Sequence, residues 1–197
     1  MLKFSFIVSL SIVATTWFAA EFSLAQDHWQ SPPIGSVKLT QDSPIAQGLA
    51  VNRRVLDAIG VDRALLAFRI QAGLPTQGAK PLGGWAGPEP YGPFPGFFES
   101  HFLSAIAMQS VHDPELVPWV HQMVAGLAEC QRALGGSYLF ASPEQEFQVD
   151  RLDGVVWYRM HKLLEGLIAA HQYAKSKEAL EIAVRLAEWT NGIPRGP

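Results

Sequence analysis

Residues 155–189 read VVWYRMHKLLEGLIAAHQYAKSKEALEIAVRLAEW and contain two consecutive helical patterns. One face of the first pattern carries Met160, Leu163, Leu164, Leu167 and His171, and the other carries Arg159, Lys162, Gln172 and Lys175. A short break at 175–177 separates it from a second apolar stripe formed by Leu180, Ala183, Val184 and Ala187. These patterns predict an antiparallel helical hairpin. Its first helix begins with Trp157 and Tyr158 and carries an inward-leaning His161, a combination that suggests a sugar site.

The preceding sequence repeats this helix–turn–helix rhythm. Ser43-Pro44 has the pattern of a helix start, with serine as the N-cap and proline at the first helical position, and Gly60 ends that helix. Asp62 is expected to cap a second, short helix. Residues 99–112 are apolar on nearly every side, and Asp113-Pro114 starts the next helix. The sequence therefore predicts an all-α fold of five or six helices paired in sequence, with negligible strand.

A Gly- and Pro-rich loop is predicted at residues 76–96, because neither a helix nor a central strand tolerates that density of glycine and proline. Trp85, Tyr91 and Phe94 lie within it. A long loop in a compact domain is usually functional or disordered. Its aromatic, polar-poor composition favours packing over disorder. We therefore expect an ordered loop.

The composition excludes some classes of function. The chain of 197 residues has room for one ordinary domain, and its 15 basic against 18 acidic side chains leave no basic footprint for nucleic acid. Six Trp and eleven Phe are many for this length. These aromatics indicate either a dense helical core or stacking platforms for sugars, and the core is the commoner use of any single ring.

A secretory signal peptide is predicted at residues 1–25. Lys3 precedes an apolar run over 4–20, and Ser23-Leu24-Ala25 offers small residues for cleavage before Gln26. The alternative is an uncleaved membrane anchor, but the run is short and interrupted by Ser and Thr. We expect a secreted or periplasmic protein with no membrane association after cleavage.

Several motifs resemble the β-L-arabinofuranosidase family, which is glycoside hydrolase family 127 and its relatives. The resemblance is carried by Trp157-Tyr158-Arg159-Met160-His161-Lys162-Leu163-Leu164-Glu165-Gly166-Leu167, by 179–183 and 186–189, by 62–75, by Gly83-Gly84-Trp85, by 100–105, and by 128–139. Two positions depart from the family pattern: Ala86 replaces a glutamate, and Gly96-Phe97 stands where the family has Gly-His.

The family fold is an (α/α)6 barrel of six helical hairpins, and the resemblance covers about Val37 to Trp189, the N-terminal part of the catalytic domain. It implies an incomplete (α/α)6 barrel at 43–191, preceded by an extended arm at 26–42 and followed by a truncated linker at 192–197. Apolar faces of an incomplete barrel would be exposed. We therefore expect self-association through exposed apolar helix faces.

The resemblance also implies a retaining mechanism with a zinc-bound cysteine nucleophile and a glutamate acid/base. All of these groups belong to the later half of the family's barrel, so we expect zinc there and assign no catalytic or metal-binding residue in this chain. Cys130 is the only cysteine, which excludes an internal disulfide. It lies on the apolar face of a helix, which is typical of a buried structural thiol. His161 and Glu165 have a spacing that could hold a metal, but a surface role for Glu165 is favoured.

The candidates for carbohydrate binding are Gln47, Trp85, His101, Trp157, Tyr158 and His161. An imidazole offers one donor and one acceptor to a pair of sugar hydroxyls. By spacing alone His161 could equally be a hydrogen-bonded core histidine, and the resemblance favours binding. For His101 the two roles stay equal. Glu99 is either a carboxylate for other chemistry or, more commonly, a helix-capping residue.

Two functions follow as hypotheses. The first is an exported glycoside hydrolase-like protein of the β-L-arabinofuranosidase type, acting on plant-type or other arabinose-containing glycans. This chain would hold the substrate-binding N-terminal part and would be inactive alone. The second is a non-catalytic helical fragment or carbohydrate-binding remnant. In both, the expected partner is a carbohydrate.

Overall fold

The computed structural model describes residues 32–84, 94–147 and 154–193. The chain divides into two compact units, Met1–Lys38 and Leu39–Pro197. In the first unit the described residues contain a short 3₁₀ helix, η1 (Ile34–Ser36). The predicted signal peptide and most of the predicted linker lie outside the described residues. Among the helices that are described, none is long and apolar enough to cross a membrane.

The second unit is built from helices. In chain order they are α2 (Pro44–Ile59), α3 (Val61–Gln71), α4 (Phe97–Gln109), η3 (Pro114–Leu116), α5 (Val117–Ala133), η4 (Glu144–Phe147), α6 (Gly154–Ala174) and α7 (Lys177–Gly192). No strand occurs within the three described ranges. The predicted all-α fold is therefore confirmed, and the arrangement is consistent with part of a helical barrel.

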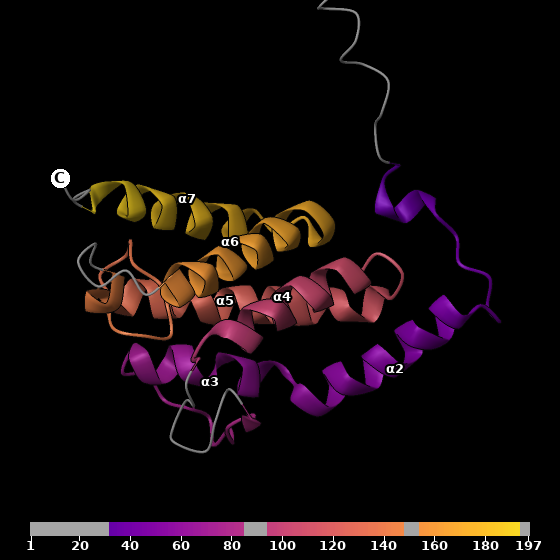
Figure 1. The fold of residues 1–197 in the computed structure, drawn as a ribbon, viewed down its shortest axis with the longest axis horizontal. Coiled ribbons are helices and arrows are strands. Elements are labelled where there is room, and N and C mark those ends of the chain that lie inside the picture. Colours follow the sequence, from indigo (N-terminus) through magenta and orange to yellow (C-terminus); the bar gives the residue numbers. More distant parts are fainter. Residues whose placement is uncertain (1–31, 85–93, 148–153, 194–197) are drawn as a thin grey trace, which may run out of the picture. The chain divides into compact units, whose positions relative to one another are not determined.

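The predicted hairpin is confirmed as α6 and α7, which lie side by side in Figure 1. Lys175 ends the first helix in the left-handed region, with φ of 58°. Ser176 then caps α7, because its side chain accepts a hydrogen bond from the Ala179 N–H at 3.3 Å. The caps of α2 also follow the prediction, since Ser43 accepts from the Ala46 N–H and Gly60 ends the helix with φ of 71°.

Helices α4 and α6 make the most extensive contact of the fold. Gly166 in α6 permits their close approach: a Cβ there would lie 3.0 Å from the Ser100 carbonyl oxygen and 3.2 Å from the Leu103 Cβ. Leu103, Leu163 and Leu167 are fully buried. The core continues from this contact to α5, which packs against α3 on one side and α7 on another. The α4–α6 contact fixes which side chains of these two helices stay at the surface.

Helix α4 differs from its prediction in two ways. It begins at Phe97, two residues before Glu99, because Gly96 adopts a left-handed conformation with φ of 83° and serves as the N-cap. It is also not buried all round. Phe98 and Met108 are 44% and 43% exposed. The expected apolar exposure is thus present on α4, while self-association stays a prediction.

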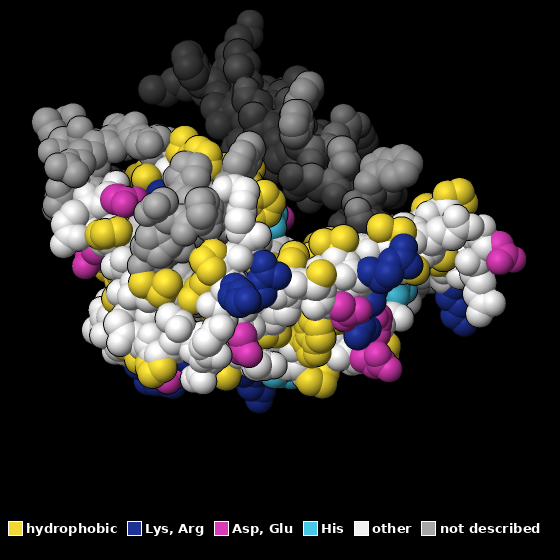
Figure 2. Space-filling view, turned by 90° about the horizontal axis from the view of Figure 1, so that it is seen from below, with side chains coloured by type: hydrophobic (Ala, Val, Ile, Leu, Met, Phe, Trp, Pro, Cys, Tyr) yellow, Lys and Arg dark blue, Asp and Glu magenta, His cyan; other side chains and the backbone are white. Residues whose placement is uncertain are grey.

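Helix α2 is joined to α4 by polar contacts. The Asn52 side chain donates to Gln109 Oε1 at 2.6 Å, and Gln109 Nε2 donates to the Leu49 carbonyl at 3.4 Å. Arg53 also pairs with Asp113, just after α4. Figure 2 shows apolar side chains interspersed with charged ones on the face seen from below. Val51 and Val55 of α2 are about half exposed, at 50% and 51%.

Candidate functional site

His101 lies on the side of α4 that faces α6. Its ring packs edge-on against Phe97, with centroids 4.8 Å apart and planes at 86°. The pKa of His101 is lowered, first by partial burial and then by the positive charge of Lys162, while Glu165 acts in the opposite direction. A neutral imidazole at neutral pH is the form that offers both a donor and an acceptor to a sugar hydroxyl.

His161 and Glu165 lie one turn apart on α6, and both are exposed. Lys162 Nζ donates to Glu165 Oε2 at 2.9 Å. The pKa of Glu165 is lowered first by this hydrogen bond, and the charges of Lys162, His161 and His101 add to the effect. Glu165 therefore lies within electrostatic reach of both histidines. We call His101, Tyr158, His161, Lys162 and Glu165 the two-histidine cluster.

The position of His161 corrects an expectation. The hairpin pattern predicted an inward-leaning ring, but the buried stripe of α6 runs through Met160, Leu163, Leu167 and Ala170 and leaves His161 exposed. Since α4 covers the adjacent face of α6, His161 lies at the edge of the α4–α6 contact instead of inside the core. This position favours ligand contact over the alternative of a core histidine.

The aromatic pair that opens α6 is divided between two environments. Tyr158 is 50% exposed and its ring lies 5.7 Å from that of Phe97, with Lys162 Nζ 5.4 Å from the Tyr158 centroid. Trp157 is half-buried and packs edge-on against Phe147 at 5.3 Å. Tyr158 thus belongs to the two-histidine cluster, whereas the structure places Trp157 in an aromatic core that also contains Tyr138 and Trp189.

The other two predicted binding residues are Gln47 and Trp85. Gln47 lies exposed near the start of α2. Trp85 lies outside the described residues. The assignment of both residues as sugar ligands therefore stays a prediction.

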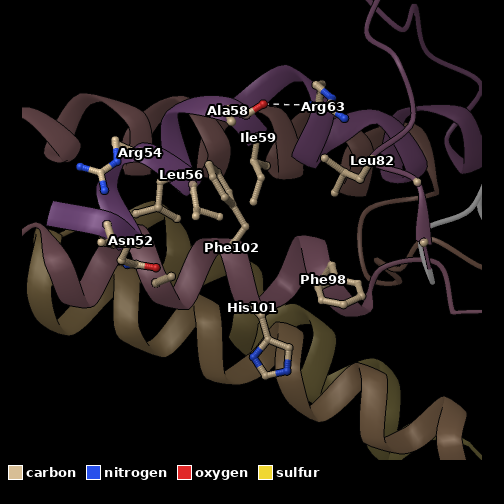
Figure 3. Close-up of a pocket in the computed structure, with 15 residues that line it drawn as sticks. Asn52, Arg54, Leu56, Ala58, Ile59, Arg63, Leu82, Phe98, His101 and Phe102 are labelled. Atoms are coloured by element: carbon tan, nitrogen blue, oxygen red, sulfur yellow. Dashed lines mark hydrogen bonds between the residues drawn. The ribbon is translucent and has the colours of Figure 1, made fainter. Parts of the chain in front are cut away.

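A pocket of about 790 Å³ lies on the other side of α4, between α2, α4 and residues 82–84. In Figure 3 Leu56, Ile59, Leu82 and Phe102 surround this space. His101 also lines the pocket, although its ring points away from these four side chains. Arg54 and Arg63 contribute charge to the rim. Arg63 is held by the carbonyl oxygens of Ala58, Lys80 and Pro81. The lining is otherwise mostly apolar, and sequence periodicity gave no signal for this pocket.

The described residues do not provide a zinc site. They contain no group of three or more His, Cys, Asp or Glu side chains placed to hold a metal ion. Cys130 is fully buried in the core, and burial raises its thiol pKa to about 12, with the charge of Arg69 acting against this. It is therefore a protonated core thiol at neutral pH, as expected. Zinc in the later part of a family barrel stays a prediction.

The helix-capping interpretation of Glu99 agrees with the structure. Its side chain is 3% exposed, in the first turn of α4, and accepts hydrogen bonds from the backbone N–H groups of Gly96 and Glu99 itself. Burial nevertheless raises the pKa of this carboxyl to about 7. Sequence reasoning found the cap, but a local pattern does not encode how deeply the tertiary fold buries this carboxyl.

Comparison with known families gives one match. The model of the β-L-arabinofuranosidase GH127 catalytic domain matches residues 36–195. The match includes all the described helices from α2 to α7. It therefore includes α4 and α6, which carry the residues of the two-histidine cluster. A comparison with curated proteins found no similar sequence.

Proposed function

Because this chain belongs to the GH127 β-L-arabinofuranosidase catalytic-domain family, we propose that its two-histidine cluster binds an arabinofuranose unit of a glycan. The observation that carries this proposal is that His101 of α4 and His161 of α6, on two helices in extensive contact, both act electrostatically on the same carboxylate, Glu165. Two imidazoles, a carboxylate and an ammonium group supply donors and acceptors for several hydroxyls. The exposed Tyr158 ring offers an apolar face beside them.

In this proposal the described residues position the sugar and do not attack it. A retaining hydrolase of this family type needs a nucleophile and an acid. The buried Cys130 thiol is unsuited to the first role, since burial raises its pKa and keeps it protonated at neutral pH. The 197-residue chain is therefore proposed to bind arabinofuranosides without hydrolysing them. Export after cleavage before Gln26 is part of the same proposal, and N-terminal sequencing of exported protein tests it.

Sugar binding is measured by isothermal titration or by NMR titration of the histidine ring protons with methyl β-L-arabinofuranoside. We expect saturable binding, with ring shifts at His101 and His161. His101→Ala and His161→Ala should each weaken binding by about two- to tenfold, since a sugar hydrogen bond contributes about 0.5–1.5 kcal/mol. The matched control is His121→Ala on α5, an exposed histidine outside the cluster. Equal binding by all three variants would refute the assignment.

A non-catalytic carbohydrate-binding protein is the second candidate, and the buried state of Cys130 favours it. Release of a chromogenic aryl β-L-arabinofuranoside, measured beside the zinc content, tests whether the chain alone is catalytic. We expect no release above the buffer rate from the chain alone. Release that disappears in Cys130→Ala would show that this thiol is catalytic and would overturn its assignment to the core.

A further inference from the structure

Arg159 is a buried cation in the first half of α6. The periodic pattern placed it on the polar side of the helix, but it is only 4% exposed. Its Nη1 donates to the Pro95 carbonyl at 2.9 Å and to Ser142 Oγ at 3.0 Å, and its Nη2 donates to Glu146 Oε2 at 3.1 Å. The guanidinium carbon also lies 5.4 Å from the centroid of the Phe140 ring. This corrects the prediction, because tertiary contacts outweigh the local pattern.

These contacts join three segments that are distant in sequence. Pro95 immediately precedes the N-cap of α4, while Ser142 and Glu146 belong to the connection between α5 and α6. A guanidinium is costly to bury unless its donors are paired. The planar fork of arginine also fixes the directions of its acceptors, which an ammonium group does not do. Arg159 therefore holds the beginning of α4 in one position relative to α6.

Glu99, in the first turn of α4, is a carboxyl group whose charge is opposite to that of Arg159. One oxygen of its carboxylate, Oε2, is buried without a hydrogen-bond partner in the described structure, and the same is true of Arg159 Nε. The positive charge of Arg159 acts on Glu99 and favours its ionised form. The two groups thus attract each other across the helix contact without a direct hydrogen bond. The cap of α4 and the fork of Arg159 form one buried unit.

The buried unit and the proposed sugar site lie in the same turns of α4 and α6, on different faces of each helix. His101 follows Glu99 by two residues on α4, and His161 follows Arg159 by two residues on α6. Further along the same α4–α6 contact, Gly166 packs directly against Leu103. We propose that Arg159, together with Glu99, is a positioning unit that sets His101 against His161 and Glu165. This inference rests on the proposed function for its effect on sugar binding, but its effect on histidine geometry is independent of that function.

Arg159→Lys is the primary test, because it keeps the charge and removes the fork. The matched control is Arg69→Lys on α3. Arg69 is also an arginine with an ion pair, to Glu129 at 3.2 Å, a backbone carbonyl partner, Pro75, and an unpartnered buried Nε. Arg69 contacts neither histidine of the cluster in the described structure. A general loss of stability should therefore be similar in the two variants.

The specific readout is the titration of His101, followed by NMR of its ring protons in the full chain. In Arg159→Lys we expect the His101 pKa to rise towards its ordinary value, because a loosened α4 start lets water reach the ring. We also expect weaker binding of methyl β-L-arabinofuranoside by about five- to tenfold. Arg69→Lys should change neither. An unchanged His101 titration in folded Arg159→Lys would overturn the proposal.

Two further measurements keep the test decisive. If Arg159→Lys does not fold, Ser142→Ala removes one acceptor of the fork and keeps the cation. A smaller shift of the His101 titration in the same direction supports the proposal, and no shift overturns it. If the wild-type chain does not bind the glycoside, the proposed function fails. The His101 titration then still decides the positioning role, so the two failures are distinguishable.

Discussion

The two sides of α4 differ in what they offer a ligand. The side facing α6 brings together two imidazoles, a carboxylate, an ammonium group and an exposed tyrosine ring over a tightly packed helix contact. The side facing α2 carries a pocket of about 790 Å³ with mainly apolar walls, to which His101 also contributes. The apolar side chains Val51 and Val55 of this pocket are half exposed. A ligand rich in hydroxyl groups needs several polar side chains that a rigid part of the protein holds close together. A pocket with apolar walls has volume but does not provide these polar groups.

The largest expected effect is a loss of stability on substitution of a side chain packed between α4 and α6, compared with a substitution on the α2 side of α4. Leu103 is fully buried between α4 and α6, so Leu103→Ala should lower the free energy of unfolding by about 2–5 kcal/mol. Val55 lines the pocket and is 51% exposed, so Val55→Ala should change it by less than about 0.5 kcal/mol. Urea denaturation followed by circular dichroism measures both. Similar losses would show that the two sides are packed equally.

A second prediction uses the buried carboxyl on the α6 side. The folded-state pKa of Glu99, about 7, lies above its ordinary value of 4.5. Between these values the folded state holds more protons than the unfolded state. The stability contributed by Glu99 is therefore complete below about pH 4.5 and is lost as the pH rises through 7.

Glu99→Gln removes this titration, so its stability relative to wild type should improve by about 2–3 kcal/mol between pH 5 and pH 8. Glu165 provides the contrasting variant, because its pKa is lowered and its pH dependence has the opposite sign. Its side chain is 48% exposed, so solvent screening makes the effect of Glu165→Gln small. Melting curves from pH 4 to pH 8 test both variants, and parallel curves for wild type and Glu99→Gln would contradict the prediction.

The third prediction concerns the distance between α4 and α6. Gly166→Ala would place a Cβ 3.0 Å from the Ser100 carbonyl oxygen, which is backbone and cannot turn away. We expect a loss of about 1–3 kcal/mol in unfolding free energy, as for other overpacked sites. In α2, Gly48→Ala meets nothing within 4 Å and should stabilise the helix by about 0.5–1 kcal/mol. Thermal melts of the wild type and of both variants measure these changes in stability. A stabilising effect of Gly166→Ala would show that α4 and α6 are more loosely packed than described.

Sequence reasoning predicted correctly those features that depend on contacts between residues close together in the sequence. Ser43, Pro44 and Gly60 mark helix ends through contacts within a few residues, and the structure confirms all three. The α6–α7 hairpin was equally visible, because each of its helices has an apolar stripe. Asp62 was expected to be a cap but lies in the first turn of α3, where the chain passes directly from the end of α2 through Gly60.

The candidate site was only partly predictable. The family motif singled out His101, Tyr158 and His161, and the fold brings these three together. Arg159 was misplaced because its partners lie 13 to 64 residues away, and no helical period records such contacts. Lys162 lay on the predicted polar face without any functional signal, and its role in the cluster depends on the packing of α4 against α6.

The cluster at the edge of the α4–α6 contact has an evolutionary consequence. His101, Tyr158, His161 and Glu165 are only partly buried or exposed, whereas the packing of the two helices depends on other positions, such as Leu103, Leu163 and Gly166. Exposed positions usually tolerate substitution with little change in stability. Selection could therefore alter which sugar is recognised while the hairpin scaffold persists. Directed libraries confined to these four positions should retain folded protein at high frequency.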